Sequence, residues 1–267
     1  GSDVCIIEVG GTVGDIEGMP YLEALRQFAH EEDEDDILFT HVTLVPYSKN
    51  GEQKTKPTQH SVKELRSIGL QPDVLVGRCE DKLHPDVKEK IALFCDVPTD
   101  AVFSNPDVDD IYHVPLMVED EGLDEYVMDH LELAPEALPE TERDTTWRDL
   151  VTRDKEGTVK VALVGKYGLE DAYISIHESL KHAGLEKQVN VEREWIHSEN
   201  LADGHDGELD GVDGIVVPGG FGSRGTEGKI EAIRYAREND LPFLGLCLGF
   251  QMAVVEYARN VLGLDGA

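Results

Sequence analysis

The feature that most constrains this chain is a cysteine between two glycines, in the stretch 244–251, Leu-Gly-Leu-Cys-Leu-Gly-Phe-Gln. The apolar run 241–244 predicts a strand, and apolar residues at helical spacing after the cysteine predict a helix. A cysteine at the apex of a strand–turn–helix has the layout of a nucleophile elbow. Glycines tolerate the backbone angles of such a turn, and a helix N-terminus favours a thiolate. The alternative is a buried core cysteine beside a glycine that packs against a helix.

A second glycine-rich turn lies upstream, in residues 214–222, Gly-Ile-Val-Val-Pro-Gly-Gly-Phe-Gly. A loop of this kind can turn backbone N–H groups toward an oxyanion, although alone it is equally typical of an ordinary turn. Together the two stretches resemble the class I glutamine amidotransferases, whose cysteine attacks the side-chain amide of glutamine and releases ammonia. The resemblance implies that Cys247 is the nucleophile and that Gly220 and Leu248 supply the oxyanion donors. The glutamine site that it implies comprises Gly220, Phe221, Leu248, Gly249, Phe250 and Gln251.

Acidic residues dominate the charge of the chain. Its 267 residues include 55 acidic and 24 basic ones, for a net charge of −31. Nucleic acid is therefore excluded as a partner, because phosphate backbones require basic surfaces. Apolar residues make up 40% of the chain and fall in periodic runs, which argues against disorder. We interpret the charge as a solvated surface suited to a salt-rich cytoplasm, where counterions screen the repulsion.

The four cysteines are widely spaced, so the sequence predicts neither a zinc site nor a disulfide framework. A reducing cytoplasm fits this usage. No run of about 18 apolar residues predicts a membrane span, and no signal peptide is visible.

Carboxylates follow an apolar run near the N-terminus. Residues 3–9, Asp-Val-Cys-Ile-Ile-Glu-Val, predict a strand buried on both faces of a parallel sheet, with Glu8 near its carboxyl end. A glycine-rich loop, 10–17, carries Asp15 and Glu17. Such carboxylates are able to hold a hard cation or ribose hydroxyls, and the alternative is a loop of solvated acids.

Basic and hydroxyl side chains gather in residues 54–62, Lys-Thr-Lys-Pro-Thr-Gln-His-Ser-Val, after a predicted strand at 37–46. Lysines and hydroxyls at a strand-to-helix transition suit phosphate oxygens, and the alternative is a polar loop. Further strands are predicted at 72–77, 101–104 and 157–167. Helices are predicted at 61–68 and at 171–183, the second ending at Gly184. Strands that alternate with helices predict a parallel sheet with right-handed crossovers.

The strings 8–17 and 54–62, with Lys-Ile-Ala-Leu-Phe-Cys at 90–95, resemble the CTP synthase family in sequence and order. In this family an amidoligase domain uses ATP and Mg²⁺ to phosphorylate UTP at its 4-oxygen. Ammonia from a C-terminal glutamine amidotransferase domain then displaces the phosphate to give CTP. The resemblance implies that Glu8 binds Mg²⁺ and that Pro106, Asp107 and Val108 lie near ATP. The contacts that it implies for UTP, or for CTP as feedback inhibitor, are Asp15, Ile16, Glu17, Lys54, Thr55, Lys56, Pro57, Thr58, Gln59 and Lys90.

The predicted fold is α/β in two parts. Residues 1–133 are expected to form part of a P-loop-type amidoligase domain, and residues 134–157 a linker. Residues 158–267 are expected to form the first portion of a flavodoxin-like class I glutamine amidotransferase domain. The resemblance further implies GTP as an activator near residues 166–173, and a homotetramer at full length.

Two family features are missing from the sequence. The triad histidine and glutamate of the family follow the cysteine at a distance, and no histidine follows Cys247. No glycine-rich phosphate loop precedes Glu8. We therefore expect this chain to be the middle of a longer protein and to be inactive by itself, in the cytoplasm. Alternatives to a CTP synthase are another amidotransferase-coupled amidoligase and a non-catalytic nucleotide-binding or filament-forming scaffold.

Overall fold

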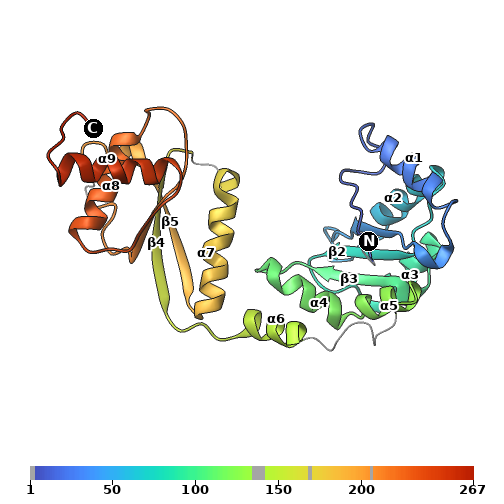
Figure 1. Cartoon of the computed structure of the whole chain (residues 1–267). Helices are drawn as coiled ribbons and strands as arrows, with labels where there is room; N and C mark the ends of the chain where they lie inside the picture. The colour runs from blue at the N-terminus through green and yellow to red at the C-terminus, as the bar shows by residue number, and fades with distance from the viewer. Residues whose placement is uncertain (1–3, 134–141, 168–169, 205–206) are drawn as a thin grey trace. The chain divides into compact units, whose positions relative to one another are not determined.

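The computed structural model describes residues 4–133, 142–167, 170–204 and 207–267, and it divides the chain into two compact units. Unit 1 is Gly1–Arg148 and unit 2 is Asp149–Ala267 (Figure 1). Each unit contains a parallel β-sheet with helices connecting its strands. This arrangement confirms the α/β class that the alternation of apolar runs predicts.

Unit 1 has a three-stranded parallel sheet in the order β1-β2-β3 (Figure 1). β2 (Val74–Cys79) is central and its apolar residues are buried on both faces, whereas β1 (Thr40–Leu44) alternates in burial. β3 (Val102–Pro106) pairs with β2, and Cys79 aligns with Pro106. The polar segments that follow β1 and β3 therefore leave the sheet at the same carboxyl edge. The helices of unit 1 are α1 (Met19–Phe28), α2 (Lys56–Ser67), α3 (Pro85–Cys95), α4 (Val114–Asp120), α5 (Leu123–His130) and the start of α6 (Glu142–Thr152).

The core of unit 1 lies between this sheet and the helices α2 and α3. Val62 of α2 and Ile91 of α3 pack with Leu75 and Val102 of the strands. Pro57 and Pro85 each occupy the first turn of a helix, where the missing N–H leaves no hydrogen bond unmade. The sequence places the start of α2 too late, at Ser61. The helix begins at Lys56, so the string 56–59 is its first turn.

The strand predicted at residues 3–9 is wrong over the part that the structure describes. Residues 4–10 form no strand, and Ile6 is 91% exposed. A strand needs ladder hydrogen bonds to a neighbour, and the described strands of this sheet are β1, β2 and β3. An apolar run predicts burial but supplies no pairing partner.

Unit 2 has a four-stranded parallel sheet in the order β5-β4-β6-β7. Counted within the unit this order is 2-1-3-4, which matches the first four strands of the flavodoxin-like order. The strands are β4 (Thr158–Gly165), β5 (Asn190–His197), β6 (Gly214–Val217) and β7 (Phe243–Gly245). The helices are α7 (Ile174–Lys187), α8 (Thr226–Glu238) and α9 (Leu248–Asn260).

One glycine of unit 2 has a role that the sequence misses. Gly184 is predicted to end its helix, but it lies buried inside α7. A Cβ at this position would come within 2.9 Å of the Val189 carbonyl oxygen. The glycine therefore allows a close approach between α7 and the chain that enters β5, and the helix continues past it.

The predicted linker, 134–157, overlaps residues 134–141, which lie outside the described part of the chain. Its described remainder contains α6, and the two units divide after Arg148. Among the described residues, no helix is long and apolar enough to cross a membrane.

Candidate active site and nucleotide-binding face

The turn between β7 and α9 carries the exposed Cys247. Its backbone has φ 51° and ψ −108°, which side-chain-bearing residues rarely adopt. The strain persists because a strand and a helix fix the turn on either side. The thiol thus projects from the apex of a strand–turn–helix, as the sequence predicts.

The glycines flanking the cysteine are explained by backbone packing. A Cβ on Gly249 would lie 2.0 Å from the carbonyl oxygen of Val217, at the end of β6. A Cβ on Gly245 would lie 2.7 Å from the carbonyl carbon of Gly249. The Leu246 N–H also donates to the Val217 oxygen at 3.0 Å. The elbow is therefore pressed against the neighbouring strand so tightly that both positions exclude a side chain.

The glycine-rich loop after β6 lies directly beside the elbow. Val217 and Gly245 are paired in the parallel ladder, so both loops leave the sheet together. A Cβ on Gly219 would be 3.4 Å from Cys247 Cβ, and one on Gly220 would be 3.6 Å from Leu248 Cδ2. Within the described residues, the N–H groups of Gly220 and Leu248 donate no hydrogen bond. This geometry suits the binding of an oxyanion formed next to the thiol.

The other predicted glutamine-site residues lie at the surface near this turn. Phe221 follows the glycine loop and is 83% exposed. Phe250 and Gln251 are exposed in the first turn of α9. These side chains are free to contact a substrate, but they do not by themselves enclose one.

Two residues outside the predicted glutamine site form hydrogen bonds with carbonyl groups of the glycine loop. The Lys229 Nζ donates to the Pro218 carbonyl at 3.1 Å, and the Tyr173 hydroxyl donates to the Gly219 carbonyl at 3.4 Å. Lys229 is fully buried. A lysine in the middle of the apolar face of α8 is the sequence signal that could have identified it.

A general base for the thiol is not found among the described residues. His177, His182 and His197 form no hydrogen bond with Cys247, and His205 lies outside the described part of the chain. His197 packs edge-on against Trp195 with ring centroids 6.0 Å apart. Over the part of unit 2 that the structure describes, the thiol and the neighbouring N–H groups are thus together without a histidine bonded to the thiol.

In unit 1, two lysines that are predicted to bind phosphate both lower the pKa of the same carboxylate. The Lys54 Nζ is 2.8 Å from Glu52 Oε2. Hydrogen bonding and charge from Lys54, and then the charge of Lys90, lower the pKa of Glu52. The Lys54 N–H donates to the Pro46 carbonyl, which ties the lysine to the end of β1. Both lysines thus contribute positive charge at Glu52, in the loop between β1 and α2.

The string 54–59 divides into exposed and buried members. Lys56 and Pro57 are exposed, whereas Thr55 and Thr58 are buried. Thr58 Oγ1 accepts from Thr43 at 3.3 Å, and the Thr55 hydroxyl accepts from Gln59 at 2.9 Å. As arranged, the lysines face solvent while the two threonine hydroxyls bond within the protein.

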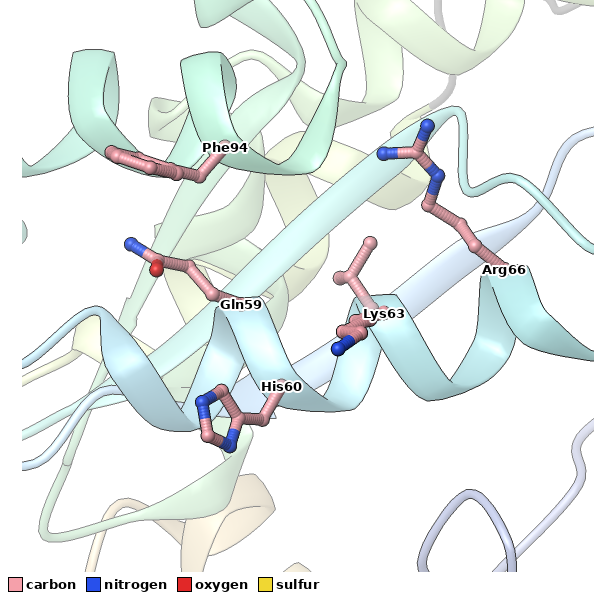
Figure 2. Close-up of a pocket in the computed structure, with 6 residues that line it drawn as sticks. Gln59, His60, Lys63, Arg66 and Phe94 are labelled. Carbon is pink, nitrogen blue, oxygen red and sulfur yellow. The ribbon is translucent and has the colours of Figure 1, made fainter.

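A pocket of 260 Å³ lies between α2 and α3. In Figure 2, Gln59 of α2 and Phe94 of α3 face each other across it, and Arg66 lies further along α2. Of the lining residues, Gln59 alone is predicted as a ligand contact, although positions 59, 63 and 66 share one helix face by spacing. The lining residues are Gln59, His60, Val62, Lys63, Arg66 and Phe94.

The predicted carboxylates near the N-terminus are not gathered into a metal site. Glu8 is exposed, as are Ile16 and Glu17. Asp15 Oδ2 accepts the Thr12 N–H at 3.0 Å, so this carboxylate closes a turn. Among the described residues, no group of three or more potential ligands is positioned to hold a metal.

The segment 106–108 follows β3 at the same carboxyl edge as Lys54. The Asp107 N–H donates to the Cys79 carbonyl at 2.8 Å, and its carboxylate lies 3.7 Å from Arg78. Pro106 is half-buried, and Val108 is exposed. The structure thus leaves this segment open to a ligand at the sheet edge.

Each of the two units contains a segment that matches a known protein family. The CTP synthase N-terminus family matches residues 1–133, and the class I glutamine amidotransferase family matches residues 169–265. Together with the elbow and the parallel sheets, these matches define a class I glutamine amidotransferase portion joined to a synthase portion.

Curated relatives narrow this class. The chain is 81% identical to the CTP synthase of Haloarcula hispanica, 74% to that of Halobacterium salinarum and 57% to that of Archaeoglobus fulgidus. Each match covers all of this chain, but 48%, 48% and 49% of the respective relative. The chain belongs to the CTP synthase family and spans about half the length of these relatives. A solved structure, the Trypanosoma brucei CTPS glutaminase domain with bound acivicin, is 42% identical over 40% of this chain and 43% of its own, with a TM-score of 0.38.

Proposed function

We propose that this chain contributes to a CTP synthase, which aminates UTP to CTP at the expense of ATP. Cys247 attacks the glutamine amide and releases ammonia as the acyl-enzyme forms, and hydrolysis of the acyl-enzyme then yields glutamate. The ammonia passes to the synthase site, where ATP and UTP give ADP, phosphate and CTP. The observation that carries this proposal is the strained Cys247 elbow packed against the Gly219–Gly220 loop, within a chain whose other half matches a CTP synthase N-terminus.

In the amidotransferase half, we assign the oxyanion to the N–H groups of Gly220 and Leu248. The remaining predicted residues, Phe221, Gly249, Phe250 and Gln251, would border the glutamine. Because all of these lie either on the glycine loop or in the first turn of α9 beside it, one substrate is able to reach them all.

In the synthase half, we assign the triphosphate of UTP, or of CTP as inhibitor, to Lys54, Lys56 and Lys90. The convergence of Lys54 and Lys90 near Glu52 supports this assignment, because a triphosphate needs several cations close together. The pyrimidine nucleotide would also meet Asp15, Ile16, Glu17, Pro57 and Gln59, with Thr55 and Thr58 supporting the string from within. ATP would lie near Pro106, Asp107 and Val108.

Mg²⁺ and GTP complete the proposal as cofactor and activator. Mg²⁺ commonly uses one or two carboxylates together with substrate phosphates, so the exposed Glu8 fits as a single protein ligand. There the ion would neutralise phosphate charge. GTP would act near residues 166–173. At full length we propose a cytoplasmic homotetramer, and the four free cysteines agree with a reducing compartment.

The test uses a chimera in which this chain replaces the matching half of the Haloarcula hispanica CTP synthase. With ATP, Mg²⁺, UTP and glutamine in high salt, we expect CTP formation. Cys247→Ser should abolish glutamine hydrolysis but leave CTP formation from added ammonia. This chain alone should form no CTP.

Other results would point elsewhere. Calorimetric binding of CTP without glutamine hydrolysis would favour a nucleotide-binding scaffold. Glutamine hydrolysis that is coupled to amidation of another acceptor, with no use of UTP, would favour a different amidoligase.

A further inference from the structure

Two consecutive peptide groups of the glycine loop are each held by one side chain. Lys229 binds the Pro218 carbonyl oxygen at 3.1 Å, and Tyr173 binds the Gly219 carbonyl oxygen at 3.4 Å. Both donors lie behind the loop, in α8 and immediately before α7. Both are also nearly or fully buried.

These contacts determine where the loop N–H groups point. In a trans peptide the C=O and the following N–H point in opposite directions. The Lys229 contact therefore directs the Gly219 N–H away from Lys229, and the Tyr173 contact directs the Gly220 N–H away from Tyr173. Glycine rotates freely about its own bonds, so without these anchors the two peptide planes have many orientations.

Burial of Lys229 requires an explanation other than stability. A buried ammonium is costly unless it is paired, and among the described residues no carboxylate pairs with Lys229. Burial, and then the charge of nearby Lys166, lower its pKa, while Cys247 acts in the opposite direction. Its Nζ would also lie 3.6 Å from a Cβ placed on Gly220. An apolar side chain of the same length would fill this space at lower cost.

We propose that Lys229 and Tyr173 are positioning residues that hold the two consecutive peptides of the 218–220 loop, so that the Gly220 N–H faces the oxyanion formed beside Cys247. The inference rests on the proposed glutamine hydrolysis and adds to it the support that keeps the oxyanion donors in place. Lys229 acts through the Pro218 peptide and need not touch glutamine. Tyr173 holds the peptide that carries the Gly220 N–H, and Lys229 holds the peptide before it. The Lys229 hydrogen bond is shorter and comes from an ammonium donor, so its removal should free the loop more and have the larger effect.

The test compares Lys229→Met, Tyr173→Phe and the surface control Lys160→Met in the same chimera. Methionine keeps the length of the lysine stem and removes the donor. We expect kcat for glutamine hydrolysis to fall about 10- to 100-fold in Lys229→Met, somewhat less than when an oxyanion donor itself is deleted, with KM little changed. The kcat of Tyr173→Phe should be severalfold lower than that of the parent, and the kcat of Lys160→Met should equal that of the parent.

Alkylation of Cys247 by iodoacetamide, followed by mass spectrometry, separates positioning from a general loss of structure. This displacement forms no oxyanion, so its rate should change less than threefold in Lys229→Met, and the melting temperature should not fall. Equal losses in alkylation and hydrolysis, or an unchanged kcat, would overturn the inference.

A structural measurement keeps the inference testable even if the parent chimera hydrolyses no glutamine, a result that would count against the proposed function alone. Crystal structures of this chain and of its Lys229→Met variant should differ in the orientation of the Pro218–Gly219 peptide. An unchanged peptide would overturn the positioning role whatever the activity.

Discussion

The elbow around Cys247 and the lysine-rich edge of unit 1 are built in different ways. At the elbow, backbone atoms meet backbone atoms, and a side chain on Gly249 would collide with the Val217 carbonyl. At the edge of unit 1, exposed Lys54 and Lys90 share the neighbourhood of a single carboxylate. Steric packing therefore fixes the geometry of the first site in the absence of a ligand. The second site is defined by positive charges that a bound anion would neutralise.

This difference predicts different sensitivities. A site built from backbone packing should fail when an atom is added, and salt should matter little to it. A site built from exposed charges should tolerate changes in volume and respond to salt, because exposed charges are screened over about 10 Å or less at moderate ionic strength.

The largest effect is expected for Gly249→Ala, which tests the steric site. The added Cβ would lie 2.0 Å from the Val217 oxygen, so the elbow must move or the unit must loosen. We expect a loss of about 4 kcal/mol in unfolding free energy. Denaturant unfolding followed by Trp195 fluorescence, in a Trp147→Phe background, reports on unit 2. Gly266→Ala is the matched control, since a Cβ there meets nothing within 4 Å. Equal midpoints for the two variants would show that the elbow is not sterically fixed.

The second-largest effect is expected from a substitution of Glu121, a partly buried carboxylate of unit 1. Glu121 accepts from Lys88 at 2.8 Å, from Lys82 at 3.0 Å and from the Ser104 N–H at 3.0 Å. Burial opposes its charge, but these donors outweigh burial and lower the pKa of Glu121 to about 2. Because the folded-state pKa is depressed from 4.5, the stabilisation is present above pH 4.5 and is lost as the pH falls through about 2.

Glu121→Gln should therefore cost about 3 kcal/mol near pH 7, and the difference from the parent should vanish toward pH 2. Fluorescence of Trp147 in a Trp195→Phe background measures unfolding of unit 1. Exposed Glu31→Gln serves as the control. A pH-independent difference would mean that lost packing, and not ionisation, explains the cost.

A smaller effect is expected for Lys54→Met at the edge of unit 1 where we propose that the nucleotide binds. Loss of one phosphate contact should weaken CTP binding by the chimera about tenfold, or about 1.4 kcal/mol, without changing stability. Isothermal calorimetry at increasing KCl should show the difference from the parent shrinking. Exposed Lys49→Met provides the charge-matched comparison. If both lysine variants bind like the parent, the triphosphate does not lie at this edge.

The smallest effect concerns the buried half of the same string. Thr58→Val keeps the shape of the side chain but removes the acceptor for Thr43, so a loss of about 1 kcal/mol in unfolding free energy is expected. Thr40→Val, on the exposed face of β1, should change stability by less than half as much. Weakened CTP binding at unchanged stability would instead identify the Thr58 hydroxyl as a ligand contact.

Short sequence patterns were sufficient to predict several elements of the structure. The Gly-x-Cys-x-Gly spacing predicted the elbow because the residues that form the turn lie within five positions of one another. The contact with Val217 that requires Gly249 comes from β6 and is not visible in this spacing. Apolar runs located β2 and β4 because strands buried on both faces are continuous in sequence.

Features that depend on distant partners were not predictable in the same way. Residues 4–9 have the composition of a strand, yet composition does not specify pairing. Gly184 was interpreted as a helix end because its contact, the Val189 carbonyl, becomes apparent only when α7 meets the start of β5. Lys229 was missed because periodicity cannot show that a buried lysine faces the Pro218 carbonyl of the glycine loop.

The outer strand of the unit 2 sheet, β5, affects how readily one molecule adds a strand to the sheet of another. In the described part of the chain β5 pairs with β4 alone, and it carries Glu192, Arg193 and Glu194 in succession. An incoming strand that sought the free backbone groups of β5 would have to place its side chains among charges of both signs. In a chain of net charge −31, such an approach is also opposed by long-range repulsion. The open edge of this sheet is therefore protected against sheet-to-sheet aggregation, which leaves the molecule able to remain dispersed at high concentration.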